Sequence, residues 1–313
     1  MSTSIDRTTV VRGAGTVKLG DVQMFDKANI AAVVESEFVD DKVSGYGNID
    51  KTLGDQLVRV SWTPSGQITP AILAALYPYG ATAIDASLFG ATDTAAEIHS
   101  MLGKKLTLHN SALTRMPSLN LGAQETPFGE AELTALVKNI TARTAAASFY
   151  TLADVAWSGT FDKTKKIKAS YTGTWDPDGT PVTIIAANGW QVDFDLNLAA
   201  QKMDDVGTYD MTFMGLTVRA KCRPVNLSEA IWDYMRMQNS ASAAIGSSQR
   251  QGYDLDINAD IAGAIDLTLK DAMFAEAPLS WGEDELRAGE IGFEASRDLT
   301  AGFGNMFEIA LST

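Results

Sequence analysis

The sequence predicts a mainly β protein, a β-sandwich or barrel with one flanking helix in each of two tandem, related halves. Two observations lead to this prediction. Apolar and polar residues alternate over short segments, which is typical of antiparallel strands with one buried face. Blocks of similar residues also recur about 160 positions apart. The chain has 313 residues, which is enough for two ordinary domains.

The repeat is clearest in a block that begins at Leu57 and returns at Thr217. Identical residues stand 160 or 161 positions apart in Val58/Val218, Arg59/Arg219, Pro64/Pro224, Lys42/Lys202, Gly47/Gly207, Asp50/Asp210, Leu106/Leu267, Leu108/Leu269, Pro117/Pro278 and Glu130/Glu290. A near-constant offset over more than half of the repeat indicates two copies of a whole domain, because the period is too long for a solenoid unit. We expect a first domain over 1–137, a linker over 138–168 and a second domain over 169–313.

The sequence of each half predicts strands, then one helix, then further strands. In the first half we expect a strand over 57–62, a helix over 69–77 that Thr69 caps before Pro70, and strands around 106–108 and 119–121. The second half repeats the order with a strand over 217–222, a helix over 228–237, and strands over 265–269 and 291–293. A small, polar stretch over 238–252 predicts a mobile loop.

Two segments, 36–54 and 200–215, mix acids, glycine and a tyrosine between strand-like runs, and we expect both to be irregular. Long connections are uncommon in compact domains unless they have a function. Two interpretations stay open: an arm ordered by neighbouring subunits, or a floppy hairpin tip.

Composition limits the possible partners. The formal net charge of −14 and the pI near 4.6 argue against a nucleic-acid-binding protein, which needs clustered Lys and Arg. No apolar run approaches the length of a membrane span, and the first residues do not resemble a secretory signal, so we expect no membrane anchor and synthesis in the cytoplasm.

No residue pattern predicts catalysis, a cofactor or a metal site, so we expect a protein that is not an enzyme. Cys222 is the single cysteine and matches Trp62 of the other copy, which favours a buried apolar position over a nucleophile. His109 is replaced by Lys270 in the second copy, which favours a surface role. The acidic pair Asp40–Asp41 lacks the spacing of a Ca²⁺ loop.

The first half resembles the major tail tube proteins of long-tailed, siphovirus-type bacteriophages. The resemblance lies in VVRGAGTVKLGDVQMFDKANI, LVRVSWTPSGQITPAILAALYPYGAT and HSMLGKKLTLHNSALTRMPSLNLGAQETPFGEAELTAL, and covers roughly residues 9–137. It extends to the second half only through the repeat.

This resemblance implies a structural virion protein whose β-sandwich subunits stack as rings into the phage tail tube, a conduit for DNA ejection. It implies a location in the virion tail and, as partners, other copies of the chain and the tape measure, tail terminator and distal tail proteins. Viral DNA would pass through the lumen without specific binding, and the acidic charge would keep it from sticking.

Most members of the family carry one domain and form hexameric rings, so the duplication implies a trimer with pseudo-sixfold symmetry. An alternative is another ring-forming tail component on the same fold, a distal tail or baseplate protein. We expect contacts between rings from the two irregular segments, through Asp40, Asp41, Lys42, Tyr46, Asp50, Lys202, Asp204, Asp205, Tyr209 and Asp210.

Overall fold

The structure is a computed structural model of the chain. It describes residues 15–27, 30–44, 46–89, 95–101, 103–123, 127–136, 150–165, 168–176, 181–203, 207–225, 252–276, 279–281, 286–297 and 304–312. The predicted helix over 228–237 and nearly all of the predicted loop over 238–252 lie outside these residues.

The described chain is mainly β, as the sequence predicted, and its sheets are antiparallel. In the order of the sequence, the elements up to the middle of the chain are β1 Gly15–Leu19, β2 Val22–Phe25, β3 Ala31–Val43, β4 Gly47–Trp62, α1 Pro70–Leu76, β5 Ala86–Ser87, β6 Ala96–Ser100, β7 Lys104–Leu108, β8 Ser111–Arg115, β9 Leu119–Leu121, β10 Ala131–Leu136 and β11 Tyr150–Asp154. A 3₁₀ turn at Lys163–Lys165 leads to β12 Thr172–Trp175, β13 Val182–Met203, β14 Gly207–Pro224, β15 Tyr253–Asn258, β16 Ile265–Glu276, β17 Leu279–Trp281, β18 Leu286–Ala288, β19 Ile291–Glu294 and β20 Phe307–Leu311.

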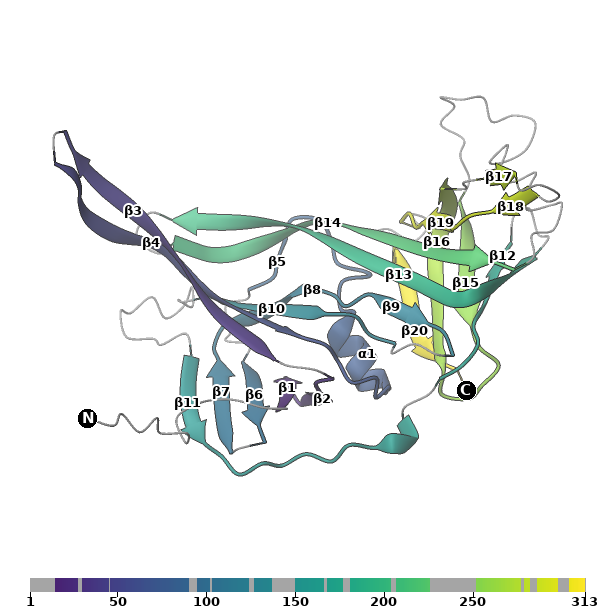
Figure 1. Ribbon diagram of the computed structural model, residues 1–313, viewed down its shortest axis with the longest axis horizontal. Helices are drawn as coiled ribbons and strands as arrows, with labels where there is room; N and C mark the ends of the chain where they lie inside the picture. Colours follow the sequence, from purple (N-terminus) through teal and green to yellow (C-terminus); the bar gives the residue numbers. More distant parts are fainter. Residues whose placement is uncertain are drawn as a thin grey trace.

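The first half contains two sheets. Their strand orders are β3-β4-β10-β8 and β11-β7-β6-β1-β2, and Figure 1 shows them as two layers with α1 beside them. Alternation builds the inner face: Val58, Val60 and Trp62 are buried, whereas Arg59 and Ser61 between them are partly exposed. The sheet β3-β4-β10-β8 therefore has one apolar and one polar face.

The second half pairs its strands in the same order. One layer has the order β13-β14-β19-β16, which corresponds to β3-β4-β10-β8. The other layer has the order β13-β12-β15-β16-β20, which corresponds to β2-β1-β6-β7-β11. The first layer uses the end of β16, and the second uses the starts of β13 and β16. Here β13 and β16 each run through both layers without a break, so the two layers are joined into one nine-stranded sheet.

The registers also agree residue by residue. Arg59 lies opposite Thr134, and Arg219 lies opposite Glu294, 160 positions later on both strands. Val34 opposite Val58 likewise corresponds to Phe194 opposite Val218. A one-residue slip would move every side chain to the other face of a sheet, so agreement on this scale places corresponding residues on corresponding faces.

Irregularities recur at the same positions. The ladder β3–β4 has register shifts after Glu37 and Asp41, and β13–β14 has them after Asn197 and Gln201, 160 positions later. Asn110 and Asp271, 161 positions apart, both adopt positive φ, at 48° and 44°. Because bulges and left-handed residues re-aim a strand, the two halves bend at the same places.

The helix predicted over 69–77 is present as α1, Pro70–Leu76. The side chain of Thr69 accepts a hydrogen bond from the backbone N–H of Ile72, and Pro70 occupies the first turn, where no N–H is needed. The buried stripe of Ile72, Leu73 and Leu76 packs into a hydrophobic core that is continuous through both halves.

Aromatic residues join the halves across this core. Tyr77, just after α1, lies 4.9 Å from Phe194 of β13 and 6.4 Å from Phe307 of β20, between ring centroids. The Tyr77 hydroxyl donates to the carbonyl of Pro117, so burial of this polar group is compensated. The two halves are thus packed together and not merely tethered.

Two sequence expectations need correction. The segments 36–54 and 200–215 consist mainly of regular hairpin strands, not irregular connections: the register shifts absorb the residues that disturb the alternation, and in the first segment exposure on both faces also removes the period-two signal. The expected linker over 138–168 contains β11, which pairs with β7 and extends the first-half sheet. The division into two domains otherwise stays a prediction.

Candidate assembly surface

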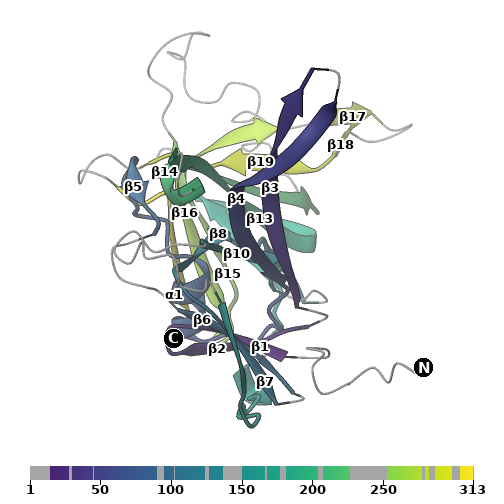
Figure 2. The ribbon, with the colours of Figure 1, turned by 90° about the vertical axis from the view of Figure 1, so that its left-hand side faces the viewer.

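The hairpin of β3 and β4 projects from the body as an arm, which we define as residues 37–55. Figures 1 and 2 show its end standing clear of the other strands. Large apolar side chains are exposed along it: Phe38, Val39, Tyr46 and Ile49. Contiguous exposed apolar residues of this kind typically mark an interaction surface.

The arm carries five of the predicted contact residues. Asp40 lies 3.6 Å from the ammonium of Lys51 on the neighbouring strand, and Asp50 accepts a hydrogen bond from the backbone N–H of Lys51. Asp41 lies directly opposite Asp50 in the ladder. Like charges at opposed positions are unfavourable, so this pair of carboxylates weakens the ladder near the tip of the arm.

The two other predicted residues of the arm lie at its tip. Tyr46 is 82% exposed in the turn, and Lys42 is exposed beside it. A tyrosine that offers this much apolar area to solvent, next to a turn that stands clear of the body, is suited to burial against another molecule.

Described residues that flank the turn of the second hairpin, by contrast, contact the first half within the chain. Lys202 of β13 places its Nζ 2.9 Å from Glu37 Oε2 and 3.3 Å from Asp55 Oδ2, at the base of the arm. Thr208 of β14 donates its backbone N–H to Asp55 Oδ1 at 2.9 Å, and its hydroxyl donates to Asp55 Oδ2. We call this contact the hairpin junction.

The electrostatics of the hairpin junction follow from its geometry. Partial burial alone would raise the pKa of Asp55, but the hydrogen bonds from Thr208 and the ammonium of Lys202 outweigh it, so the pKa lies below its ordinary value. The carboxylates of Glu37 and Asp55 raise the pKa of Lys202. Gly207 adopts φ +74°, and a Cβ there would lie 2.6 Å from Asp55 Oδ1, so this turn fits closely against the arm.

The remaining predicted residues divide into three groups. Asp210 is buried and accepts hydrogen bonds from the backbone N–H groups of Phe89 and Met211, at 3.2 Å and 2.7 Å. It therefore holds the segment around β5 and is not a surface contact, contrary to the expectation. Tyr209 is half-buried at a register shift of β14. Asp204 and Asp205 lie outside the described residues.

Two first-half strands add to the edges of the second hairpin. β9 pairs with β13 through Leu119 opposite Val192 and Leu121 opposite Trp190. β5 pairs with β14 through Ser87 opposite Thr212. Since β8 and β9 follow each other closely in the chain, the edge strand β8 of the sheet β3-β4-β10-β8 leads directly to β9, which pairs with β13 of the neighbouring sheet (Figure 1).

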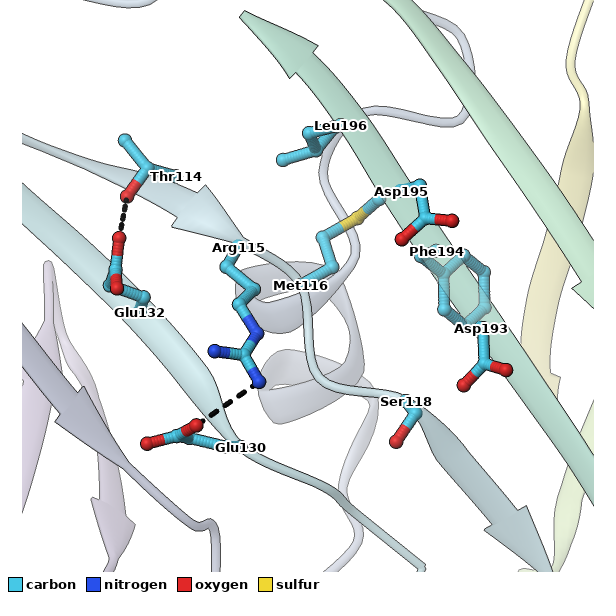
Figure 3. A pocket seen from close by; sticks show the side chains of 10 residues that line it. All are labelled: Thr114, Arg115, Met116, Ser118, Glu130, Glu132, Asp193, Phe194, Asp195 and Leu196. Atoms are coloured by element: carbon cyan, nitrogen blue, oxygen red, sulfur yellow. Dashed lines mark hydrogen bonds and ion pairs between the residues drawn. The ribbon is translucent and has the colours of Figure 1, made fainter.

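A polar groove of about 440 Å³ marks the place where these sheets meet. Figure 3 shows Arg115 and Glu130 on one side, joined by an ion pair of 3.0 Å, and Asp193 and Asp195 of β13 on the other. Ion pairs continue along the same polar face. They join Arg59 to Glu35 and Glu132, Arg219 to Glu294, and Lys221 to Glu290. The chain thus presents one charged wall across both halves.

The single cysteine and the two histidines of the chain occupy buried or half-buried positions. Cys222 is buried, as its match to Trp62 predicted, and burial raises the pKa of its thiol to about 12, which keeps it protonated at neutral pH. His99 is buried next to Glu97 and His109 is half-buried. Over the described ranges, no group of three or more His, Cys, Asp or Glu side chains could hold a metal ion, and no helix is long and apolar enough to cross a bilayer.

Sequence reasoning missed the partners in the hairpin junction. Asp55 and Thr208 are 153 positions apart, and neither stands in a motif. The one available signal was the alignment of the two copies: Asp55 falls on Gly215 and Glu37 falls on Asn197, so the copies differ in charge where one hairpin covers the other.

No protein-family model matches this chain, and no curated protein matches it significantly.

Proposed function

We propose that the chain is a structural, non-catalytic protein that assembles head to tail into rings of three copies, which stack into a tube of the kind found in phage tails. The observation that carries the proposal is the addition of β9 to β13, by which the sheet β3-β4-β10-β8 lies beside its counterpart, the strands β13-β14-β19-β16 of the nine-stranded sheet. Repetition of this step would close a barrel and leave no unpaired sheet edge.

The dimensions support a wide channel. Each chain contributes β3, β4, β10 and β8 and their counterparts β13, β14, β19 and β16 to the wall. Three chains would then supply about 24 strands. With strands about 4.8 Å apart and tilted by about 40°, the barrel would measure roughly 45–50 Å between opposite backbones. A double-stranded DNA could pass through a lumen of this size.

The charged face suits a lumen. Its cations are held in ion pairs by neighbouring carboxylates, as Arg59 is by Glu35 and Glu132, and Asp193 and Asp195 add further negative charge. With the chain at −14 overall, such a surface would repel phosphates and let DNA move without adhering.

The arm suits a contact between rings. It extends away from the wall (Figure 2) and exposes Phe38, Val39 and Ile49. Contacts that join unlike surfaces propagate as filaments unless they close on themselves, so an arm that reaches the next ring would turn rings into a tube.

Electron microscopy of the purified full chain tests the proposal. Tubes whose cross-section averages to strict threefold symmetry, with six similar lobes, are the expected result. Single rings that never stack would favour the alternative, a distal tail or baseplate protein. Monomers at all concentrations would contradict both functions.

A further inference from the structure

Within the chain, β9 of the first half pairs with β13 of the second half. The strands that correspond to these two in the opposite halves are β17 and β3, and they do not pair with each other in the described chain. On one side, β9 contacts residues 127–128 through a β-bridge between Leu119 and Phe128. On its other side, β9 pairs with β13. Its counterpart β17 has β18 on the first side, where Leu279 lies opposite Ala288. Leu279 and Ala288 stand 160 positions after Leu119 and Phe128. On its second side, β17 pairs with no strand of the described chain.

The acceptor edge is β3. Within the described residues, β3 is the last strand of its sheet, and it corresponds to β13, the strand that receives β9. Val192 and Trp190 of β13 correspond to Ala32 of β3 and to Ile30, the residue just before β3. A sheet edge with unpaired backbone groups is a template for another strand.

We infer that β17 of one copy pairs with the start of β3 in the next copy, in the register that β9 uses on β13. This inference rests on the proposed head-to-tail ring. It places Leu279 opposite Ala32, Ser280 opposite Ala31, and Trp281 opposite Ile30. The partner is therefore a second copy of this chain, joined by β-strand addition.

The hairpin tips lead to the same arrangement. Gly207 and Gly47 are 160 positions apart and share nearly the same φ, +74° and +76°. A Cβ on Gly207 would meet Asp55, whereas a Cβ on Gly47 would have nothing within 4 Å. The turn of the arm is thus shaped like the turn that contacts Asp55 in the other half. The β13–β14 base of the copy that donates β17 would cover this turn, while Phe38, Val39 and Ile49 remain for the contact between rings.

The two contacts would differ in charge. Inside the chain, Lys202 meets Glu37 and Asp55. In the contact between copies, Lys42 would meet Asn197 and Gly215, which carry no charge. The contact between chains therefore lacks these ion pairs, which suits an assembly that forms only when subunits are concentrated.

A disulfide test uses the corresponding pairs. Ala31→Cys with Ser280→Cys should link different chains in assembled, oxidised protein and give a ladder on a non-reducing gel that ends at about three chains, as a threefold ring requires. The matched control, Asn120→Cys with Gln191→Cys, joins residues already opposite each other within one chain and should give an internal disulfide only. Buried Cys222 stays in both variants.

The outcomes separate the inference from the function. If rings form and the control disulfide forms, but Ala31→Cys with Ser280→Cys gives no link between chains, the inference is overturned and the ring stays intact. A wild-type chain that forms no rings would overturn the proposed function as well. If the double variant misfolds, mixing the single variants Ala31→Cys and Ser280→Cys should give a dimer band, and its absence from assembled mixtures would again exclude the pairing.

Discussion

Thr208 donates both its backbone N–H and its hydroxyl to the carboxylate of Asp55, which stands 153 positions earlier in the chain. This contact fixes the tip of one hairpin on the base of the other. The corresponding tip of the first half has no such partner among the described residues. One contact therefore distinguishes two hairpins whose strands share the same register and the same bulges.

Asp55→Asn should destabilise the chain by about 1–3 kcal/mol, because the amide cannot accept both hydrogen bonds from Thr208 equally and no longer balances Lys202. Urea unfolding measured by circular dichroism checks this. Asp50→Asn on the exposed arm is the control and should change the free energy of unfolding by less than about 0.5 kcal/mol. Equal effects of the two substitutions would show that the hairpin junction contributes nothing.

Glu97 predicts a dependence of stability on pH. Its carboxylate is 2.7 Å from Lys105 Nζ and 3.0 Å from His99 Nε2, and these hydrogen bonds lower its pKa from 4.5 to about 2. A carboxyl with a lowered pKa contributes stability that is fully present above its unfolded pKa and is lost as the pH falls through its folded pKa.

The stability difference between the wild type and Glu97→Gln should therefore be about 1–2 kcal/mol near pH 6, after allowance for screening at a partly exposed site, and should shrink as the pH falls from 4.5 towards 2. Urea midpoints recorded at several pH values measure it. A difference that stays constant over this range would contradict the assigned ion pairs.

Gly207→Ala and Gly47→Ala form a matched pair. Both glycines have positive φ, so each alanine costs about 1 kcal/mol in the left-handed region. At position 207 the new Cβ also meets Asp55 at 2.6 Å, which should add a further cost of about 1–2 kcal/mol. Thermal or urea unfolding of the two variants compares them, and indistinguishable stabilities would mean that the turn does not press on Asp55.

Shortening the arm should prevent assembly and leave the fold intact. Val39 lies opposite Thr52, so replacing residues 40–51 by Asn-Gly would reconnect the strands through a two-residue turn. We expect a folded monomer that forms no tubes in electron micrographs, since the exposed tip stands clear of the rest of the described chain (Figure 2).

The equivalent replacement of residues 200–211 is the control for that experiment. This replacement removes Lys202 and Thr208 from the hairpin junction, so it should lower the free energy of unfolding, whereas the shortened arm should not. Normal tubes from the variant with the shortened arm would contradict the role proposed for the arm.

The sequence by itself determined the class of fold and the correspondence between its parts. Alternation over residues such as Val58, Val60 and Trp62 predicted strands, and Thr69 followed by Pro70 predicted the start of α1, because these signals depend on neighbours in the chain. The constant offset from Arg59 to Arg219 likewise predicted which residues would share a place in the two halves.

Only the tertiary structure decided which of two equivalent segments is covered. Lys42 and Lys202 stand in similar sequences and both are exposed, yet Lys202 pairs with Glu37 and Asp55 of the other half. Asp210 looked like a surface acid and is buried against Phe89. Such outcomes depend on contacts between residues more than a hundred positions apart, which bring desolvation and hydrogen-bond energies that local patterns do not contain.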